Sequence, residues 1–263
     1  MLNEKVCLVT GSAGGIGRAT AIEMARQQAG AVMVCDLNDE GGQETVELVR
    51  AAGADAAYQH CDMRSPDDIR GVIEATVERF GGLDVLHNNA GVHESDFTTS
   101  LTVETLPEEI FDRIYEINLR GPWLAMKYAA PHLRASTRGP SIINAGSTGG
   151  ITGYPNMNAY GATKGGLIQL TRCVAVDLAP DVRVNAYTPA SVDTQMVRKF
   201  VDAAEDKEAI MSFMVATHLV PRLGYPEEVA KLVCFLASDD ASWITGSVYS
   251  IDGGSMCWRG SRV

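Results

Sequence analysis

The stretch KVCLVTGSAGGIG, residues 5–17, decides the expected fold of this chain. It opens with the apolar run 5–9 and ends in the glycine-rich turn 10–17, and residues 18–28 then have the composition of a helix. Glycines let a backbone approach a pyrophosphate closely, and a helix N-terminus presents free N–H groups and a positive dipole to it. Since such turns also simply connect elements, the turn alone indicates a phosphate site only weakly.

The next apolar run strengthens this interpretation. Residues 31–35 read as a buried strand that ends at Asp36, about 20 residues after the glycines, where dinucleotide-binding folds place an acid for the adenosine ribose. The alternative is a plain loop acid. The Asp36 carboxylate would repel a 2′-phosphate, and neither Gly14 nor Leu37 supplies a cation to neutralise one. These residues therefore favour NAD over NADP as the cofactor.

Strand-like and helix-like segments alternate along the whole chain, which is typical of a parallel sheet with helices on both faces. Right-handed crossovers then give the strand order 3-2-1-4-5-6-7. We expect an α/β fold, a single doubly wound Rossmann-type domain over residues 1–263, because no linker or repeat interrupts the pattern. The remaining strands are expected at residues 56–62, 83–87, 141–145, 182–187 and 247–251. Further helices are expected from Ser65, as the cap, and over 107–134, around 160–164 and from 226.

Composition and charge narrow the class of partner. The formal net charge is −11 and no run is rich in Lys or Arg, which argues against nucleic acids and anionic membranes. No apolar stretch approaches the roughly 20 residues that span a bilayer, and the N-terminus lacks the pattern of a signal peptide. We therefore expect a cytoplasmic protein with a small-molecule substrate.

Cysteine and histidine positions give no sign of a disulfide or a metal site. The six cysteines are scattered without a C-x-x-C pair, and the five histidines are equally dispersed. Reduced cysteine in apolar runs packs as a small hydrophobe. We predict neither a disulfide nor a bound metal.

Tyr160 and Lys164 are candidates for chemistry because a spacing of four residues puts both side chains on one helix face. A nearby ammonium stabilises a phenolate and lowers the pKa of the tyrosine. Ser147 follows a strand-like run and can face the phenol across a cleft. The pair alone is weak, because its usual meaning is a solvated face. Asn118, in mid-helix, is either a satisfied buried amide or a polar group kept beside the chemistry.

The chain resembles the short-chain dehydrogenase/reductase family over residues 5–254, with five motifs in order and at the family's spacing. The motifs are the cofactor turn Thr10-Gly11-x-x-x-Gly15-x-Gly17, the adenine-side acid Asp62, the strand end Asn88-Asn89-Ala90-Gly91, the catalytic set Asn118 and Ser147, and the pair Tyr160 and Lys164. The resemblance implies cofactor contacts from Gly11, Ser12, Gly15, Ile16, Gly17, Asp36, Leu37, Asp62, Met63, Asn89, Ala90, Gly91, Tyr160, Lys164, Pro189, Val192 and Thr194.

The resemblance also implies a role for each catalytic residue. Tyr160 would be the general base in oxidation and the general acid in reduction, and Lys164 would lower its pKa and hold the nicotinamide ribose. Ser147 would orient the substrate oxygen, and Asn118 would place a water that links Lys164 to solvent. Hydride passes directly to or from the nicotinamide, so no metal is needed. Relatives are often tetramers, so we expect a homo-oligomer.

Two positions depart from the family pattern. Ala190 follows Pro189 where a glycine is usual, which makes the contacts from Val192 and Thr194 less secure. Gly146 precedes Ser147 where a second serine is common, and we expect this to widen the floor of the substrate site.

The leading hypothesis is an NAD-dependent oxidoreductase acting on a secondary alcohol or its ketone. A non-catalytic NAD-binding regulator would not need Tyr160, Lys164 and Ser147 together, and a methyltransferase with the same turn would not need Ser147. Reduction of 3-oxoacyl groups on a carrier protein fits poorly, since carrier proteins are themselves acidic.

Residues 189–194 are expected to open a long irregular region, and residues 190–220 to form a substrate lid, because a plain connection of this length is unusual in a compact domain. Methionines and other apolar residues give this segment faces that need cover; the alternatives are a subunit interface or the core. We expect it to close the site together with residues 93–97 and 153–155. An apolar pocket anchored by Ser147 and Tyr160 would prefer an uncharged, hydrophobic or cyclic secondary alcohol to a sugar. The apolar residues are Met196, Val197, Phe200, Ile210, Met211, Phe213, Met214 and Val215.

Overall fold

A computed structural model describes residues 1–202 and 206–258, and it contains the expected parallel sheet. The seven strands follow the order β3-β2-β1-β4-β5-β6-β7, as predicted, and all of their pairings are parallel. Each predicted strand agrees with the observed one to within two residues at either end. The strands are β1 (Val6–Thr10), β2 (Ala31–Asp36), β3 (Asp55–His60), β4 (Val85–Asn88), β5 (Ser141–Ala145), β6 (Arg183–Pro189) and β7 (Val248–Ile251).

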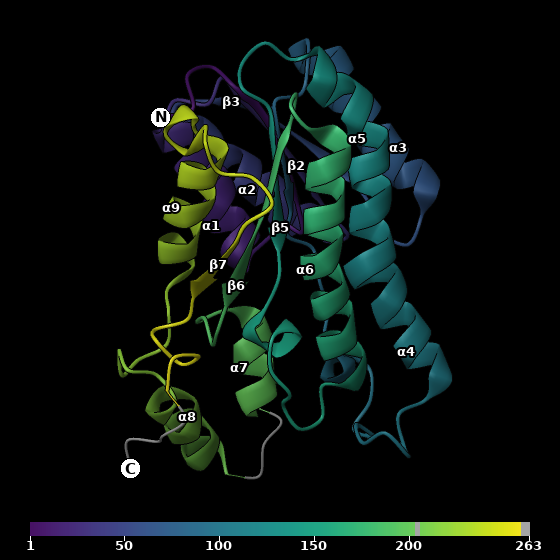
Figure 1. The fold of residues 1–263 in the computed structure, drawn as a ribbon, viewed down its shortest axis with the longest axis vertical. Helices are drawn as coiled ribbons and strands as arrows, with labels where there is room; N and C mark the ends of the chain where they lie inside the picture. The colour runs from purple at the N-terminus through teal and green to yellow at the C-terminus, as the bar shows by residue number, and fades with distance from the viewer. Residues whose placement is uncertain (203–205, 259–263) are drawn as a thin grey trace.

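Helices cover both faces of the sheet (Figure 1). Apolar residues of α1, α2 and α9 pack on one face, and those of α3, α5 and α6 pack on the other. The central strands β1 and β4 are buried throughout, which explains why they read as continuous apolar runs. The helices are α1 (Gly15–Arg26), α2 (Asp39–Ala51), α3 (Pro66–Phe80), α4 (Glu108–Tyr115), α5 (Gly121–Ala135), α6 (Asn158–Leu178), α7 (Gln195–Asp202), α8 (Lys207–Ala216) and α9 (Pro226–Ala237).

The stretch predicted as one helix over residues 107–134 has an irregular centre. Five residues, Glu116–Arg120, form a π-helical turn, η2, between α4 and α5. π-turns inserted into α-helices are frequent at functional sites. Asn118 lies in this turn and is fully buried.

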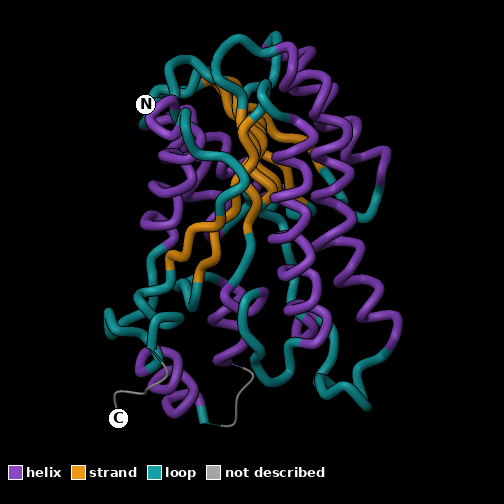
Figure 2. Tube along the Cα trace, viewed as in Figure 1, coloured by secondary structure: helices purple, strands orange, loops and turns teal. Residues whose placement is uncertain are grey.

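The long segment after β6 is more regular than expected. The prediction of an irregular connection is wrong for α7 and α8, which lie beyond the carboxyl ends of the strands (Figure 2). Residues 203–205 of the expected lid lie outside the described part of the chain. Both helices are short, and α8 has no buried residue, so the sheet does not bury it as it buries α1 or α6.

Candidate functional site

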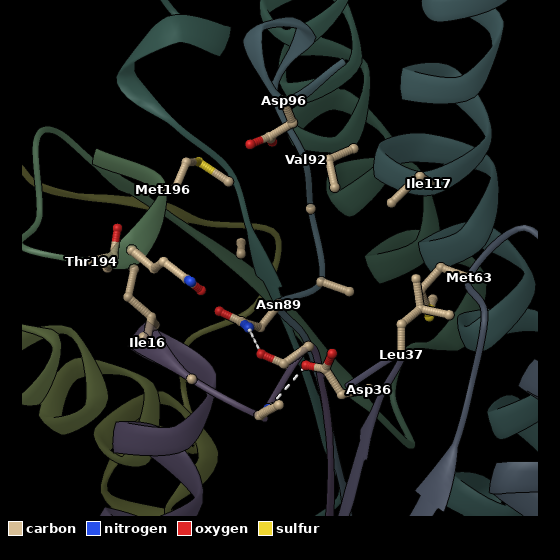
Figure 3. Close-up of a pocket in the computed structure, with 18 of the residues that line it drawn as sticks. Ile16, Asp36, Leu37, Met63, Asn89, Val92, Asp96, Ile117, Thr194 and Met196 are labelled. Atoms are coloured by element: carbon tan, nitrogen blue, oxygen red, sulfur yellow. Dashed lines mark hydrogen bonds between the residues drawn. The ribbon is translucent and has the colours of Figure 1, made fainter. Parts of the chain in front are cut away.

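A cavity of about 560 Å³ opens at the carboxyl edge of the sheet. Figure 3 shows Leu37, Met63 and Ile117 on one side of it and Thr194 and Met196 on the other. Most residues predicted to contact a cofactor line this single space. They are Gly11, Gly15, Ile16, Asp36, Leu37, Asp62, Met63, Asn89, Ala90, Gly91, Tyr160, Lys164, Pro189 and Thr194.

Three predicted cofactor residues lie behind this lining. The Ser12 hydroxyl is fully buried and donates to the Val9 carbonyl at 2.8 Å, so it braces the turn. Gly17 packs so closely that an added Cβ would lie 2.6 Å from Nδ2 of Asn89. Val192 is buried and forms an isolated parallel bridge with Gly224.

The glycine turn is tied to the end of β4. The Thr10 hydroxyl accepts from the backbone N–H groups of Asn89 and Ala90 at 3.0 and 3.1 Å, and Asn89 Nδ2 donates to the Gly11 carbonyl at 2.9 Å. Gly11 has a φ of +64°, and an added Cβ would lie 2.7 Å from the Ala90 Cα atom. A side chain at this position would therefore push the two segments apart.

The start of α1 and the end of β2 present the groups that a dinucleotide requires. The N-cap Gly14 provides no side-chain acceptor, so the first N–H groups of α1 are available to a pyrophosphate. Asp36 is held by two backbone bonds, from Ala13 N at 2.9 Å and Asn38 N at 3.0 Å. The residues present therefore fit a nicotinamide dinucleotide, and Asp36 presents a fixed carboxylate at the end of β2.

Tyr160 and Lys164 project from α6 into the same cavity, where Lys164 is buried and Tyr160 is half-buried. Burial raises the pKa of the Tyr160 phenol; a hydrogen bond with Ser147 acts in the opposite direction, and the Glu94 charge adds to the rise. Lys164 Nζ donates to the Ala145 carbonyl at 2.7 Å, and burial lowers its pKa to about 8.

The expectation that Lys164 lowers the pKa of Tyr160 is not met in this structure. The ammonium lies 5.7 Å from the centre of the Tyr160 ring, and its hydrogen bond goes to a backbone carbonyl. Desolvation of the phenolate outweighs the remaining influences on Tyr160.

Asn118 is a fully satisfied buried amide. Its Oδ1 accepts from Val92 N at 2.9 Å, and its Nδ2 donates to the Val92 carbonyl at 2.8 Å. Neither Asn118 nor Ser147 lines the cavity directly. Asn118 therefore holds the segment after β4 against the π-helical turn, at the back of the site.

Gly146 does not widen the floor of the site, contrary to the prediction. A Cβ added there would lie 2.9 Å from the Tyr187 carbonyl and 3.0 Å from Cγ2 of Thr188, so it would point into the packing against β6. The missing side chain is explained by crowding beneath the cavity.

The expected lid reaches the cavity through its first helix. Thr194, Gln195, Met196 and Lys199 contribute to the lining. Phe213, which we expected to face the site, is 63% exposed.

Sequence reasoning missed several residues near Tyr160. The His93 ring packs against the Tyr160 ring with 5.1 Å between centroids, and Glu94 is fully buried beside it. Phe97 and Arg113 line the cavity and stack on each other at 4.4 Å. Of these residues, only those of the segment 93–97 were anticipated, because that segment was expected to help close the site.

Two kinds of feature are absent from residues 1–202 and 206–258. No helix there is both long and apolar enough to cross a lipid bilayer. No cluster of three or more His, Cys, Asp or Glu side chains in these ranges could hold a metal ion.

The chain is similar to a known protein family and to several known proteins. A protein-family model described as "Enoyl-(Acyl carrier protein) reductase" matches residues 11–256. Cyclohexanol dehydrogenase of Acinetobacter sp. (strain SE19) is 37% identical over 253 residues, which is 95% of this chain and 94% of that protein. Cyclopentanol dehydrogenase of Comamonas sp. (strain NCIMB 9872) is 35% identical over 254 residues, 96% of this chain and 97% of that one.

A solved structure is also similar. The ligand-free aldohexose dehydrogenase of Thermoplasma acidophilum superposes with a TM-score of 0.88 at 33% identity, covering 100% of this chain and 98% of that one.

Proposed function

The chain belongs to the short-chain dehydrogenase/reductase family, and on this premise we propose that it is an NAD-dependent dehydrogenase of uncharged cyclic secondary alcohols. One observation carries the proposal: Tyr160, with the Ser147 hydroxyl beside it, opens into the same cavity as the glycine turn and Asp36. The relatives named for cyclohexanol and cyclopentanol support the substrate class.

The residues divide the reaction between them. A bound NAD would supply the acceptor for the hydride that leaves the alcohol carbon. Ser147 orients the substrate hydroxyl, and Tyr160 takes the hydroxyl proton on its phenolic oxygen as general base. In the reverse direction Tyr160 returns that proton to the ketone. Lys164 would bind the nicotinamide ribose, while the glycine turn and Asp36 would hold the pyrophosphate and the adenosine ribose.

The direct test is a panel of secondary alcohols with NAD, followed by the absorbance of the reduced cofactor. We expect turnover of cyclohexanol and cyclopentanol and little turnover of an aldohexose. Reduction of a 3-oxoacyl carrier-protein thioester is the second candidate, since the matching family model carries an acyl-carrier description. The net charge of −11 disfavours it, because carrier proteins are acidic.

We also propose that the enzyme is a cytoplasmic homotetramer and that residues 190–220 act as its substrate lid, closing mainly through α7. Family resemblance supports the tetramer, and the cavity lining from Met196 and Lys199 supports the lid.

Cofactor choice is expected to depend on Asp36. Asp36→Ala combined with Leu37→Arg should move the ratio of kcat/KM for NAD and NADP roughly 100-fold toward NADP, because it removes a repulsive carboxylate and adds a partner for the 2′-phosphate. Asp36→Asn keeps an acceptor for the Ala13 N–H and is the control for damage to the turn. A parent enzyme that already uses both cofactors equally would contradict this assignment.

Substrate class is expected to depend on Met196, the apolar side chain that α7 adds to the cavity. Met196→Ser should lower kcat/KM for cyclohexanol by about tenfold and leave an aldohexose unaffected or improved, because it removes apolar contact with the ring. Phe213→Ser changes an exposed residue of α8 and is the matched control. Equal losses for both substrates would show that Met196 does not select for apolar rings.

A further inference from the structure

The loop between β4 and α4 is docked on the first turn of α6. Asn158 Nδ2 donates to the Leu101 carbonyl at 2.8 Å. Oε1 of Glu94 accepts from two backbone N–H groups of α6, Ala159 at 2.7 Å and Tyr160 at 2.9 Å. The backbone of Tyr160 is thus bonded directly to a side chain from another element.

Helix α6 needs this contact, because its own N-cap residue, Met157, supplies no side-chain acceptor. The first N–H groups of a helix have no partner within the helix, and a negative charge there also interacts favourably with the helix dipole. Glu94 supplies both the acceptor oxygen and the negative charge, and its side chain is fully buried. A buried carboxylate is costly unless it is hydrogen-bonded, so its place here requires the α6 amides.

The second oxygen of Glu94 faces the ring of His93. Oε2 lies 3.5 Å from His93 Nε2. The Ser95 N–H donates to His93 Nδ1 at 3.1 Å, which assigns the proton of the neutral ring to Nε2, facing the carboxylate. Burial lowers the pKa of His93, so the ring is neutral at pH 7. Its face packs against Tyr160.

We propose that Glu94 is a positioning residue for the acid/base Tyr160, which it fixes through the α6 backbone on one side and through the His93 ring on the other. The inference rests on the proposed function, because it assigns Tyr160 the proton transfer. Glu94 also acts through its charge, which raises the pKa of Tyr160. The other titratable groups facing Tyr160 are Lys164 on α6, His93 in the loop and Tyr187 on β6.

Two substitutions separate the cap from the charge. Glu94→Gln keeps an oxygen for the α6 amides and loses the charge, so the rise of kcat with pH in cyclohexanol oxidation should move to lower pH with kcat largely kept. Glu94→Ala loses both, and kcat should fall roughly 10- to 100-fold while KM for NAD stays close to that of the parent, because a small displacement of a catalytic group is enough. Ser65→Ala removes the cap of α3, away from Tyr160, and is the control for a generic loss of helix capping.

A further measurement does not depend on turnover. Hydrogen exchange of the peptide covering residues 157–165, without substrate, should be faster in Glu94→Ala than in the parent, with Glu94→Gln close to the parent. If the parent oxidises no cyclic alcohol, the proposed function fails and exchange alone decides whether Glu94 holds α6. An unmoved pH profile in Glu94→Gln together with a Glu94→Ala loss no larger than that of Ser65→Ala would overturn the inference. Unchanged exchange in both Glu94 variants would overturn it equally.

Discussion

Tyr160→Phe is expected to lose turnover by roughly 100- to 10,000-fold while NAD binds as tightly as in the parent, since general acid/base groups contribute about that much. The substitution removes one hydroxyl from a half-buried ring and little volume, so the packing against His93 is retained. The hydroxyl of Ser147 loses a polar neighbour, which adds a smaller cost.

The measurements are kcat with cyclohexanol and the dissociation constant of NAD by calorimetry. Tyr115→Phe removes a hydroxyl from an exposed ring on α4 and should leave both unchanged. A Tyr160→Phe enzyme that retained more than a few per cent of parental kcat would show that the proton goes elsewhere.

Lys164→Met is expected to reduce kcat by about 100-fold or more and, unlike Tyr160→Phe, to weaken NAD binding by about tenfold, because it removes a charge and the ribose contact together. Calorimetry of the two variants side by side tests this difference. Equal NAD affinity in both would contradict the binding role of Lys164.

Lys164→Met is also expected to change how the free energy of unfolding depends on pH. Burial lowers the Lys164 pKa from its ordinary 10.5 to about 8, so the unfolded chain holds the proton more tightly and folding bears a cost below pH 8. That cost, roughly 3 kcal/mol, disappears as the pH rises from 8 to 10.5. Lys164→Met should therefore have a larger free energy of unfolding than the parent at neutral pH, and this advantage should shrink as the pH rises from 8 to 10.5. Denaturant unfolding at pH 7 and pH 10 measures it, and a difference that does not vary with pH would contradict it.

Much of the fold could be predicted from sequence because strand burial and helix capping depend on residues that are close together in the chain. Central parallel strands are buried on both faces, so β1, β2 and β5 stand out as apolar runs between polar turns. Ser65 was predicted as a cap and does accept from Asp68 N at 3.2 Å. The helix α7 was missed although its apolar residues, Met196, Val197, Phe200 and Val201, recur at helical spacing. The helix α8 was missed because it is apolar on several sides and buries none of its residues, so its sequence shows no single apolar face.

Within the candidate site, too, the residues related by short spacing could be predicted, and those brought together by the fold could not. Spacing alone placed Tyr160 beside Lys164 and Asp36 at the end of β2, because each relation lies within one element or one crossover. Glu94 had no such signal, since its partners lie some 65 residues away on α6. The pKa direction of Tyr160 was also beyond sequence, because it depends on how completely the fold excludes water from the phenol.

The π-helical turn Glu116–Arg120 limits how this chain can change in length. A π-turn holds about one residue more than an α-turn, so deleting a single residue there would restore regular helix between α4 and α5 without rotating one against the other. Most single-residue deletions in a helix break its register, whereas this one would repair it and swing the Asn118 amide away from the Val92 backbone. Comparisons of natural variants can therefore be expected to show substitutions in this turn but a fixed number of residues.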